Sequence, residues 1–76
     1  MKTLDETFFH IVHHPSFSEY LCLIRTQHFP FAEAATELLD ELLDPETPIA
    51  FQRALYKDVY DCLREEVYGR FNKQKI

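Results

Sequence analysis

The sequence predicts an all-α fold, a compact bundle of about four helices connected by short loops that contain proline. The first observation behind this prediction is that apolar residues recur at helical spacing along most of the chain. The second is that prolines and capping residues divide the pattern into four segments, approximately 4–14, 16–28, 30–44 and 48–68. The third is the composition, which is 46% hydrophobic with one glycine and therefore typical of a folded domain.

The first predicted helix, 4–14, begins at a capping box and ends at a proline. Thr3 and Glu6 have the spacing at which each side chain accepts a hydrogen bond from the other residue's main-chain N–H. Pro15 disfavours the helical conformation of the residue before it, so the helix is expected to stop there. Its apolar side is expected to consist of Leu4, Phe8, Ile11 and Val12.

The second predicted helix, 16–28, has similar signals at its ends. Ser16 and Glu19 form a second capping-box pattern, and Phe29 followed by Pro30 interrupts the helix. The apolar stripe of this helix contains Phe17, Tyr20, Leu21 and Ile24. These four side chains are expected to face the core.

The third predicted helix, 30–44, is apolar on one side and acidic on another. Its apolar residues are Phe31, Ala35, Leu38, Leu39 and Leu42. The acidic side consists of Glu33, Glu37, Asp40, Glu41 and Asp44, and no lysine, arginine or histidine lies between Glu33 and Glu46. Like charges one turn apart destabilise a helix by about 0.2–0.5 kcal/mol per pair. We therefore expect these five carboxylates to bind a partner protein with a basic surface; a merely solvated face is the alternative.

The fourth predicted helix, 48–68, is the longest. Thr47 followed by proline fits an N-cap with proline at the first helical position, and Gly69 is placed to cap the C-terminus. A basic tail, 70–76, follows. No linker or low-complexity segment interrupts the chain, so residues 1–76 are expected to form a single domain.

Apolar residues cover about half the circumference of this fourth helix, more than a single core requires. The helix is therefore either central in the bundle or packed along one edge against a second copy. The candidate self-association edge consists of Tyr56, Tyr60, Leu63 and Val67. Because a chain of 76 residues buries only a marginal core, we expect a homodimer. Glu66 lies within the apolar arc, and Arg25 is a candidate partner for it.

Three histidines, His10, His13 and His14, precede Pro15 and lie with Glu6 on one side of the first predicted helix, where Glu6, His10 and His14 follow one another at intervals of one turn. Histidines one turn apart can bind zinc, which makes these three residues weak candidates for metal ligands. We favour an electrostatic interpretation, in which histidines in the last turn and acids in the first turn complement the helix dipole. A closed metal site needs four ligands, and no second pair is nearby, so no metal or other cofactor is expected.

The overall charge balance restricts the classes of partner. Thirteen acidic residues against eight basic ones give a net charge of −5, so direct binding of nucleic acid is not expected. No apolar run approaches a membrane span and no secretion leader opens the chain, which predicts a soluble, cytoplasmic protein without membrane contact. Cys22 and Cys62 are expected to be small buried apolar residues, with a disulfide between them as the less favoured alternative.

No catalytic pattern is present, and the chain is not expected to be an enzyme. The single glycine cannot form a phosphate-binding loop, and no glycine-flanked elbow surrounds Ser16 or Ser18. The expected function is that of a small acidic regulatory or adaptor protein that inhibits or bridges a partner protein. One alternative is a phage-type inhibitor that mimics nucleic acid and occupies a basic groove in an anti-defence or anti-transcription role. The other is a metal-binding module that uses Glu6, His10 and His14.

Overall fold

The computed structural model describes residues 3–69 and confirms the predicted all-α fold. In chain order the helices are α1 (Leu4–Val12), α2 (Pro15–Gln27), α3 (Phe31–Leu42) and α4 (Ile49–Arg64), followed by a π-helical segment η1 (Glu65–Gly69). No strand occurs within these 67 residues. The predicted basic tail, 70–76, lies outside the described residues.

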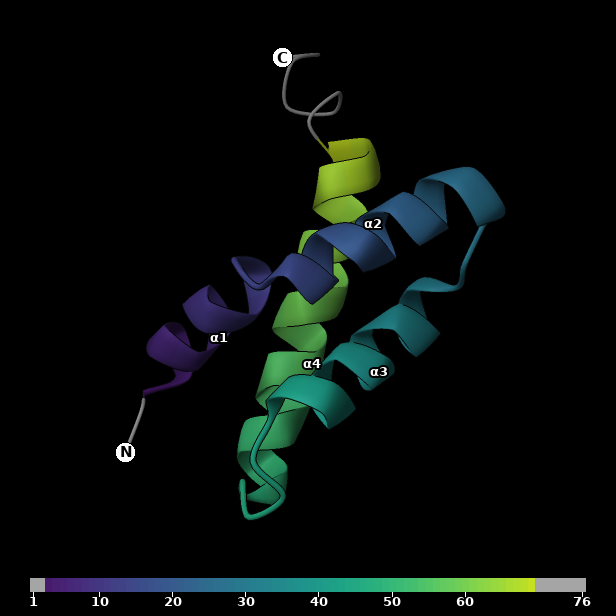
Figure 1. Cartoon of the computed structure of the whole chain (residues 1–76). Coiled ribbons are helices and arrows are strands. Elements are labelled where there is room, and N and C mark those ends of the chain that lie inside the picture. Colours follow the sequence, from purple (N-terminus) through teal and green to yellow (C-terminus); the bar gives the residue numbers. More distant parts are fainter. Residues whose placement is uncertain (1–2, 70–76) are drawn as a thin grey trace.

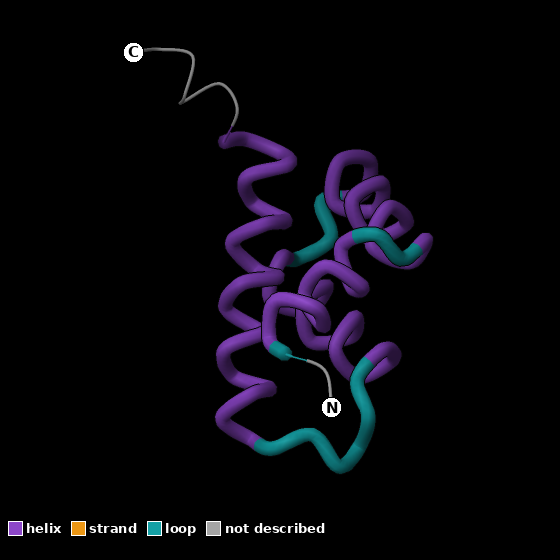
Figure 2. The backbone as a smooth tube through the Cα atoms, turned by 90° about the vertical axis from the view of Figure 1, so that its left-hand side faces the viewer, coloured by secondary structure: helices purple, strands orange, loops and turns teal. Residues whose placement is uncertain are grey.

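Helix α4 forms the spine of the bundle. Figure 1 shows α2 and α3 crossing α4 obliquely. In this view α1 lies on the left, and the loop between α2 and α3 lies on the right. When the molecule is turned, α4 stands along one side and the other three helices lie together on the other (Figure 2). Helix α4 packs against α1 and α3, and α2 packs against α3 and η1. The longest helix, for which a central position was one of two possibilities, thus lies along one side of the bundle, where it contacts α1 and α3 within the single chain.

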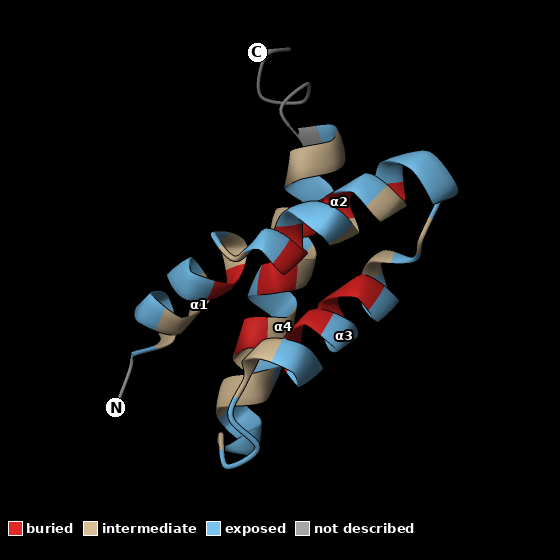
Figure 3. Ribbon diagram, viewed as in Figure 1, coloured by how far each residue is buried: buried red, intermediate tan, exposed pale blue. Residues whose placement is uncertain are grey.

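The hydrophobic core receives side chains from all four α-helices and gathers where α1–α3 face α4 (Figure 3). Three residues of α4, Leu55, Val59 and Leu63, have no exposed surface. The remaining core residues are Ile11, Phe17, Leu21, Ile24, Ala34, Ala35, Leu38 and Leu39. The predicted stripes of α2 and α3 thus face the interior, and each fully buried leucine contributes roughly 1.5–3 kcal/mol to folding.

The start of α1 has the predicted capping box. The main-chain N–H of Glu6 donates to Thr3 Oγ1 at 3.1 Å, and the N–H of Thr3 donates to Glu6 Oε1 at 3.0 Å. The helix ends at Val12, two residues before the predicted end at 14, and His13 is its C-cap. The His13 Nδ1 atom lies 2.9 Å from the Phe9 carbonyl oxygen, which also accepts the His13 main-chain N–H at 3.1 Å, so the imidazole adds a second contact at this helix end.

The predicted capping box of Ser16 and Glu19 is wrong. Helix α2 begins one residue earlier than predicted, with Pro15 at its first position and His14 as its N-cap. The His14 Nδ1 atom accepts a hydrogen bond from the Ser16 main-chain N–H at 3.1 Å. Proline suits this first position because its missing N–H would have no partner in the helix, and His14 then stands where an N-cap must be. The Ser16 hydroxyl is left available for another contact.

The predicted N-cap of the fourth helix is also wrong. The Thr47 hydroxyl donates to the Asp44 carbonyl at 2.7 Å, within the loop that joins α3 to α4. Pro48 occupies the N-cap position without a side-chain hydrogen bond, and α4 starts at Ile49. At the other end the α-helical pattern stops at Arg64 and continues as η1 up to Gly69.

The predicted contact between Arg25 and Glu66 is present, and it involves the main chain of Glu66. The Arg25 guanidinium donates from Nη2 to the Glu66 carbonyl oxygen at 2.9 Å. This hydrogen bond ties α2 to the wider turn of η1, where the ordinary α-helical bonding of α4 has ended.

Both cysteines are free, and the expectation that both are buried is wrong for Cys22, which is exposed. Cys62 is half-buried on α4. Burial raises the pKa of the Cys62 thiol, and the negative charges of Glu66 and Glu65 raise it further. Only the thiolate reacts rapidly with electrophiles, so both burial and this pKa slow the reaction of Cys62.

We therefore expect an alkylating reagent such as iodoacetamide to modify Cys22 before Cys62 near neutral pH. Peptide mapping by mass spectrometry at successive times measures both rates, and the Cys22→Ser variant should retain only the slow reaction. Equal rates at the two thiols in the folded protein would contradict the burial and charge that surround Cys62.

The His14 cap predicts a loss of stability on substitution. His14→Ala removes the acceptor for the Ser16 N–H, and loss of a side-chain N-cap typically costs about 1 kcal/mol. His14→Asn supplies another acceptor of the preferred N-cap type and should retain most of the stability. Chemical denaturation of both variants measures the free energy of unfolding; equal values for His14→Ala and the wild type would exclude a stabilising cap at this position.

Candidate functional site

The acidic face consists of the five carboxylates Glu33, Glu37, Asp40, Glu41 and Asp44, all of which are exposed. The first four lie on α3, whereas Asp44 lies beyond the end of the helix at Leu42. Within residues 3–69 no lysine, arginine or histidine forms an ion pair with any of them; the ion pair found there joins Lys57 to Asp61 on α4. The predicted clustering of acids without a compensating cation is thus a property of the folded surface.

Two members of the acidic face contact α2 through neutral donors. The Tyr20 hydroxyl donates to Glu37 Oε1 at 2.7 Å, and the Ser16 hydroxyl donates to Glu41 Oε2 at 2.8 Å. Ser16 is 7% exposed, so the Glu41 bond reaches into the edge of the core. These carboxylates therefore fasten α2 to α3, a structural role that the sequence does not indicate.

The Glu37 carboxylate changes the chemistry of Tyr20. The hydrogen bond that Tyr20 donates to Glu37 raises the pKa of the phenol to about 12, with further contributions from burial and from the charges of Glu37, Glu41 and Glu19. Hydrogen bonding of the neutral phenol to a carboxylate favours the protonated form. Tyr20 consequently remains a donor across the whole neutral and mildly alkaline range.

Asp44 serves the loop that follows α3. Its carboxylate oxygen Oδ1 accepts a hydrogen bond from the Glu46 main-chain N–H at 3.1 Å, the bond of an Asx turn. Its carbonyl oxygen also accepts the Thr47 main-chain N–H at 3.0 Å. Glu33 and Asp40 are the two acidic-face residues whose side chains make no hydrogen bond or ion pair with the rest of residues 3–69, which leaves both carboxylates available to an external partner.

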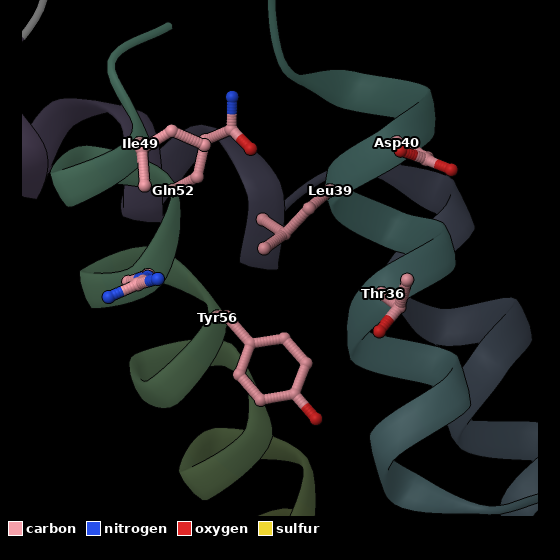
Figure 4. A pocket seen from close by; sticks show the side chains of 7 residues that line it. Thr36, Leu39, Asp40, Ile49, Gln52 and Tyr56 are labelled. Atoms are coloured by element: carbon pink, nitrogen blue, oxygen red, sulfur yellow. The ribbon is translucent and has the colours of Figure 1, made fainter.

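A groove runs between α3 and α4 and has a volume of about 320 Å³. Figure 4 shows Thr36, Leu39 and Asp40 on the α3 side, and Ile49, Gln52 and Tyr56 on the α4 side. Arg53 also lines the α4 wall. Asp40 thus belongs to both the acidic face and the groove. Reasoning from the sequence missed this groove, although the spacing of Ile49, Arg53 and Tyr56 along one side of a helix was a usable signal.

The predicted self-association edge of α4 is divided between the core and the surface. Leu63 has no exposed surface, whereas Tyr56, Tyr60 and Val67 are half-buried against the core. The rings of Tyr56 and Tyr60 stack with centroids 6.1 Å apart. Leu63 is thus placed in the interior of its own chain, and Tyr56, Tyr60 and Val67 are the members of the edge that retain exposed surface.

A row of aromatic rings extends from Tyr60 toward the C-terminal end of the described chain. The Phe31 ring lies 6.1 Å from Tyr60 and 5.7 Å from Tyr68, measured between centroids. The Arg64 guanidinium lies 5.8 Å from the Phe31 ring and 5.9 Å from the Tyr60 ring, within cation–π distance. Tyr68 is 55% exposed, so this row reaches the surface at η1.

The three weak metal-ligand candidates have separate roles. Glu6 is part of the α1 capping box, and the Nδ1 atom of His14 caps α2. The His10 and His14 rings meet edge to face with centroids 5.8 Å apart. Within residues 3–69 no three histidine, cysteine, aspartate or glutamate side chains are grouped as metal ligands.

His10 also lines a second hollow, which lies between α1 and the loop joining α3 to α4 and has a volume of about 450 Å³. Asp44 and Glu46 line it from the loop, and Leu42 and Phe51 add apolar surface. Asp44 connects this hollow to the acidic face, just as Asp40 connects the groove to it.

Comparison with protein-family models, with curated proteins and with solved structures finds no match for this chain. Its function is therefore argued from the site geometry. None of the helices within residues 3–69 combines the length and the apolarity that crossing a membrane requires.

The Tyr20–Glu37 contact predicts an alkaline transition. Between the ordinary tyrosine pKa of 10 and the raised value of about 12, the folded chain keeps a proton that the unfolded chain releases. The contribution of Tyr20 to stability is thus complete below pH 10 and is lost as the pH rises through this interval. Absorbance titration of tyrosinate should show one phenol ionising near pH 12 in the folded protein.

Two variants identify the source of this titration. Glu37→Ala should return the late-ionising phenol toward its ordinary pKa, and Tyr20→Phe should remove it from the titration curve. Glu33→Ala is the matched control, because Glu33 makes no contact with Tyr20 within the described chain. If the ionisation near pH 12 persists in the Tyr20→Phe variant, the raised pKa belongs to another tyrosine.

Proposed function

We propose that this protein is a small regulatory or adaptor protein that acts by binding a partner protein, not by catalysis. The acidic face is its docking surface, and the partner presents a basic one. The observation that carries the proposal is the exposure of all five carboxylates without a cation paired to them in residues 3–69. Binding inhibits the partner or bridges it to another protein.

The energetics of α3 support a docking surface. Glu33 and Glu37, and Glu37 and Glu41, are like-charge pairs one turn apart, each of which destabilises the helix by about 0.2–0.5 kcal/mol. A partner that places lysine or arginine against these positions relieves the repulsion. Opposite charges also accelerate encounter, so the acidic face is expected to raise the association rate, most strongly at low ionic strength.

A phage-type inhibitor that mimics nucleic acid is the second candidate. It is favoured by the spacing of the exposed carboxylates along successive turns of α3, because such a row can take the place of a phosphate backbone. The two candidates differ in the partner's surface. Excess duplex DNA or RNA displaces this protein from a nucleic-acid-binding groove, whereas it leaves an ordinary protein–protein complex largely intact when ionic strength is held constant.

We further infer that the chain self-associates, as the wide apolar arc of α4 predicts. Tyr56 and Tyr60 keep partly exposed rings on the outside of this arc, and tyrosine is favoured at interfaces because its ring is apolar and its hydroxyl is polar. A chain of this size also gains a larger shared core by dimerising. This homodimer does not depend on the partner that the acidic face binds.

The docking proposal is tested with a charge-matched pair of variants. The triple variant Glu33→Gln, Glu37→Gln and Glu41→Gln neutralises three of the five carboxylates of the acidic face while keeping acceptors for Tyr20 and Ser16. The control variant Glu19→Gln, Glu46→Gln and Asp58→Asn removes the same three charges from exposed positions elsewhere. Each protein is used to capture partners from the native host, and the affinity of the most abundant captured protein is then measured with purified components.

We expect the acidic-face variant to bind that partner about tenfold more weakly than the control, a loss of about 1.4 kcal/mol and within the range for three surface charge pairs. Circular dichroism checks that both variants remain helical. Equal affinities of the two variants would exclude the acidic face as the docking surface.

A further inference from the structure

The two walls of the α3–α4 groove carry opposite charges. Asp40 lies on the α3 wall and Arg53 on the α4 wall, and both residues are exposed. No ion pair joins them, and within residues 3–69 neither forms an ion pair with any other residue. Figure 4 shows the Asp40 side chain directed away from α4, so its charge lies at the outer rim of the groove, where it is available to a molecule that covers the groove.

Between these charges the groove presents apolar surface. Ile49 is 63% exposed, although isoleucine is usually among the most buried residues. Leu39 and the half-buried Tyr56 ring line the groove with it, and Figure 4 shows the Leu39 side chain directed toward α4. A molecule that covers Ile49 and Tyr56 removes this apolar surface from water.

An arrangement of one acidic wall and one basic wall is complementary to itself. In a twofold dimer each contact occurs twice, because residue i of one copy meets residue j of the other and the reverse. An axis that passes through the groove, between Asp40 and Arg53, places the α3 wall of each copy against the α4 wall of its partner. Asp40 then faces Arg53 of the second copy at two equivalent positions, with the apolar groove between them.

We propose that a second copy of this chain occupies the α3–α4 groove, paired through Asp40 and Arg53 across a twofold axis and covering Ile49 and Tyr56. The proposal rests on the self-association inferred above and assigns a surface to it. This surface differs from the edge indicated by the sequence, since it excludes the buried Leu63 and adds Ile49 and the α3 wall. Tyr60, stacked on Tyr56, extends the contact along α4.

Two observations favour a second copy over a basic partner in this groove. Arg53 would repel a basic segment entering it, whereas a second copy supplies Asp40 to meet this charge. The acidic face also has another flank, where Glu37 and Glu41 contact α2. That flank remains open to a basic partner when the groove is occupied, so one helix serves two interfaces.

The proposal is tested by reversing the charges one at a time. Asp40→Arg leaves two cations in the groove, and Arg53→Asp leaves two acids. In the proposed dimer of either variant, like charges at positions 40 and 53 of the two copies therefore repel each other. We expect the dissociation constant of each homodimer to rise at least tenfold, because each variant turns two attractive contacts of the twofold dimer into two repulsive ones. Sedimentation equilibrium over a concentration series measures these constants.

Mixing the two variants provides the decisive comparison. An equimolar mixture of Asp40→Arg and Arg53→Asp places opposite charges together at both positions, and a heterodimer should form with near wild-type affinity. The double variant should regain its homodimer for the same reason. Asp58→Arg, which adds a cation on the exposed side of α4 outside the groove, is the control and should dimerise like the wild type.

Ile49→Ser tests the apolar part independently of charge and should also weaken the dimer at least tenfold; Ile49 lies outside the core, so folding should be retained. A wild-type protein that remains monomeric at high micromolar concentration would overturn self-association altogether. If the dimer persists unchanged in both charge-reversal variants and in Ile49→Ser, the groove is excluded as the dimer interface, and self-association itself still stands. Neither result bears on the acidic face and its partner, whose capture experiment keeps Asp40 unchanged.

Discussion

The burial of one row of α4 organises the whole bundle. Leu55, Val59 and Leu63 have no exposed surface, although α4 lies along one side of the molecule (Figure 2). Their cover comes mainly from α1 and α3, which pack directly on α4, and α2 adds its core side chains from beyond α3 and α1. Helices α1 and α3 are thus held mainly by the spine, and α2 is held by α3, α1 and η1. In a chain this small a single shared row concentrates the limited apolar burial in one place.

The bonds between α2 and α3 supplement this burial and also shape the surface. Tyr20 and Ser16 donate to carboxylates that would otherwise only repel one another along α3. A neutral donor satisfies a carboxylate without removing its charge, so α3 is attached to the bundle and remains strongly negative. A lysine or arginine paired with either carboxylate would have cancelled part of the negative charge of the acidic face.

The sequence predicted the helices and their inward faces well, because prolines and apolar spacing act over a few residues. The capping box of Thr3 and Glu6 was predicted for the same reason. The start of α2 was not, since an imidazole competes with the serine that follows it, and the pattern alone does not rank the two. The boundaries of α1 and α4 shifted by a few residues where histidine and threonine side chains bonded to nearby main chain.

The candidate sites depended on tertiary contacts to different degrees. The concentration of negative charge on the acidic face follows from the absence of cations in its segment, which is visible in the sequence. The division of its members between α2, the loop and the groove depends on how α3 is rotated against its neighbours. The same is true of Ile49, the first residue of α4. Whether its side chain faces the core or the surface depends on how α3 packs on α4.

The junction between α1 and α2 contains no spacer, because the C-cap of one helix, His13, is adjacent to the N-cap of the next, His14. Pro15 fixes its own φ and also restricts the conformation of His14, so few torsion angles remain free at this corner. The direction of α1 relative to α2 is therefore set by the restricted torsion angles at this junction as well as by packing in the core. Insertion of one residue at the corner would turn α1 about its axis and carry Ile11, which is fully buried, away from α4.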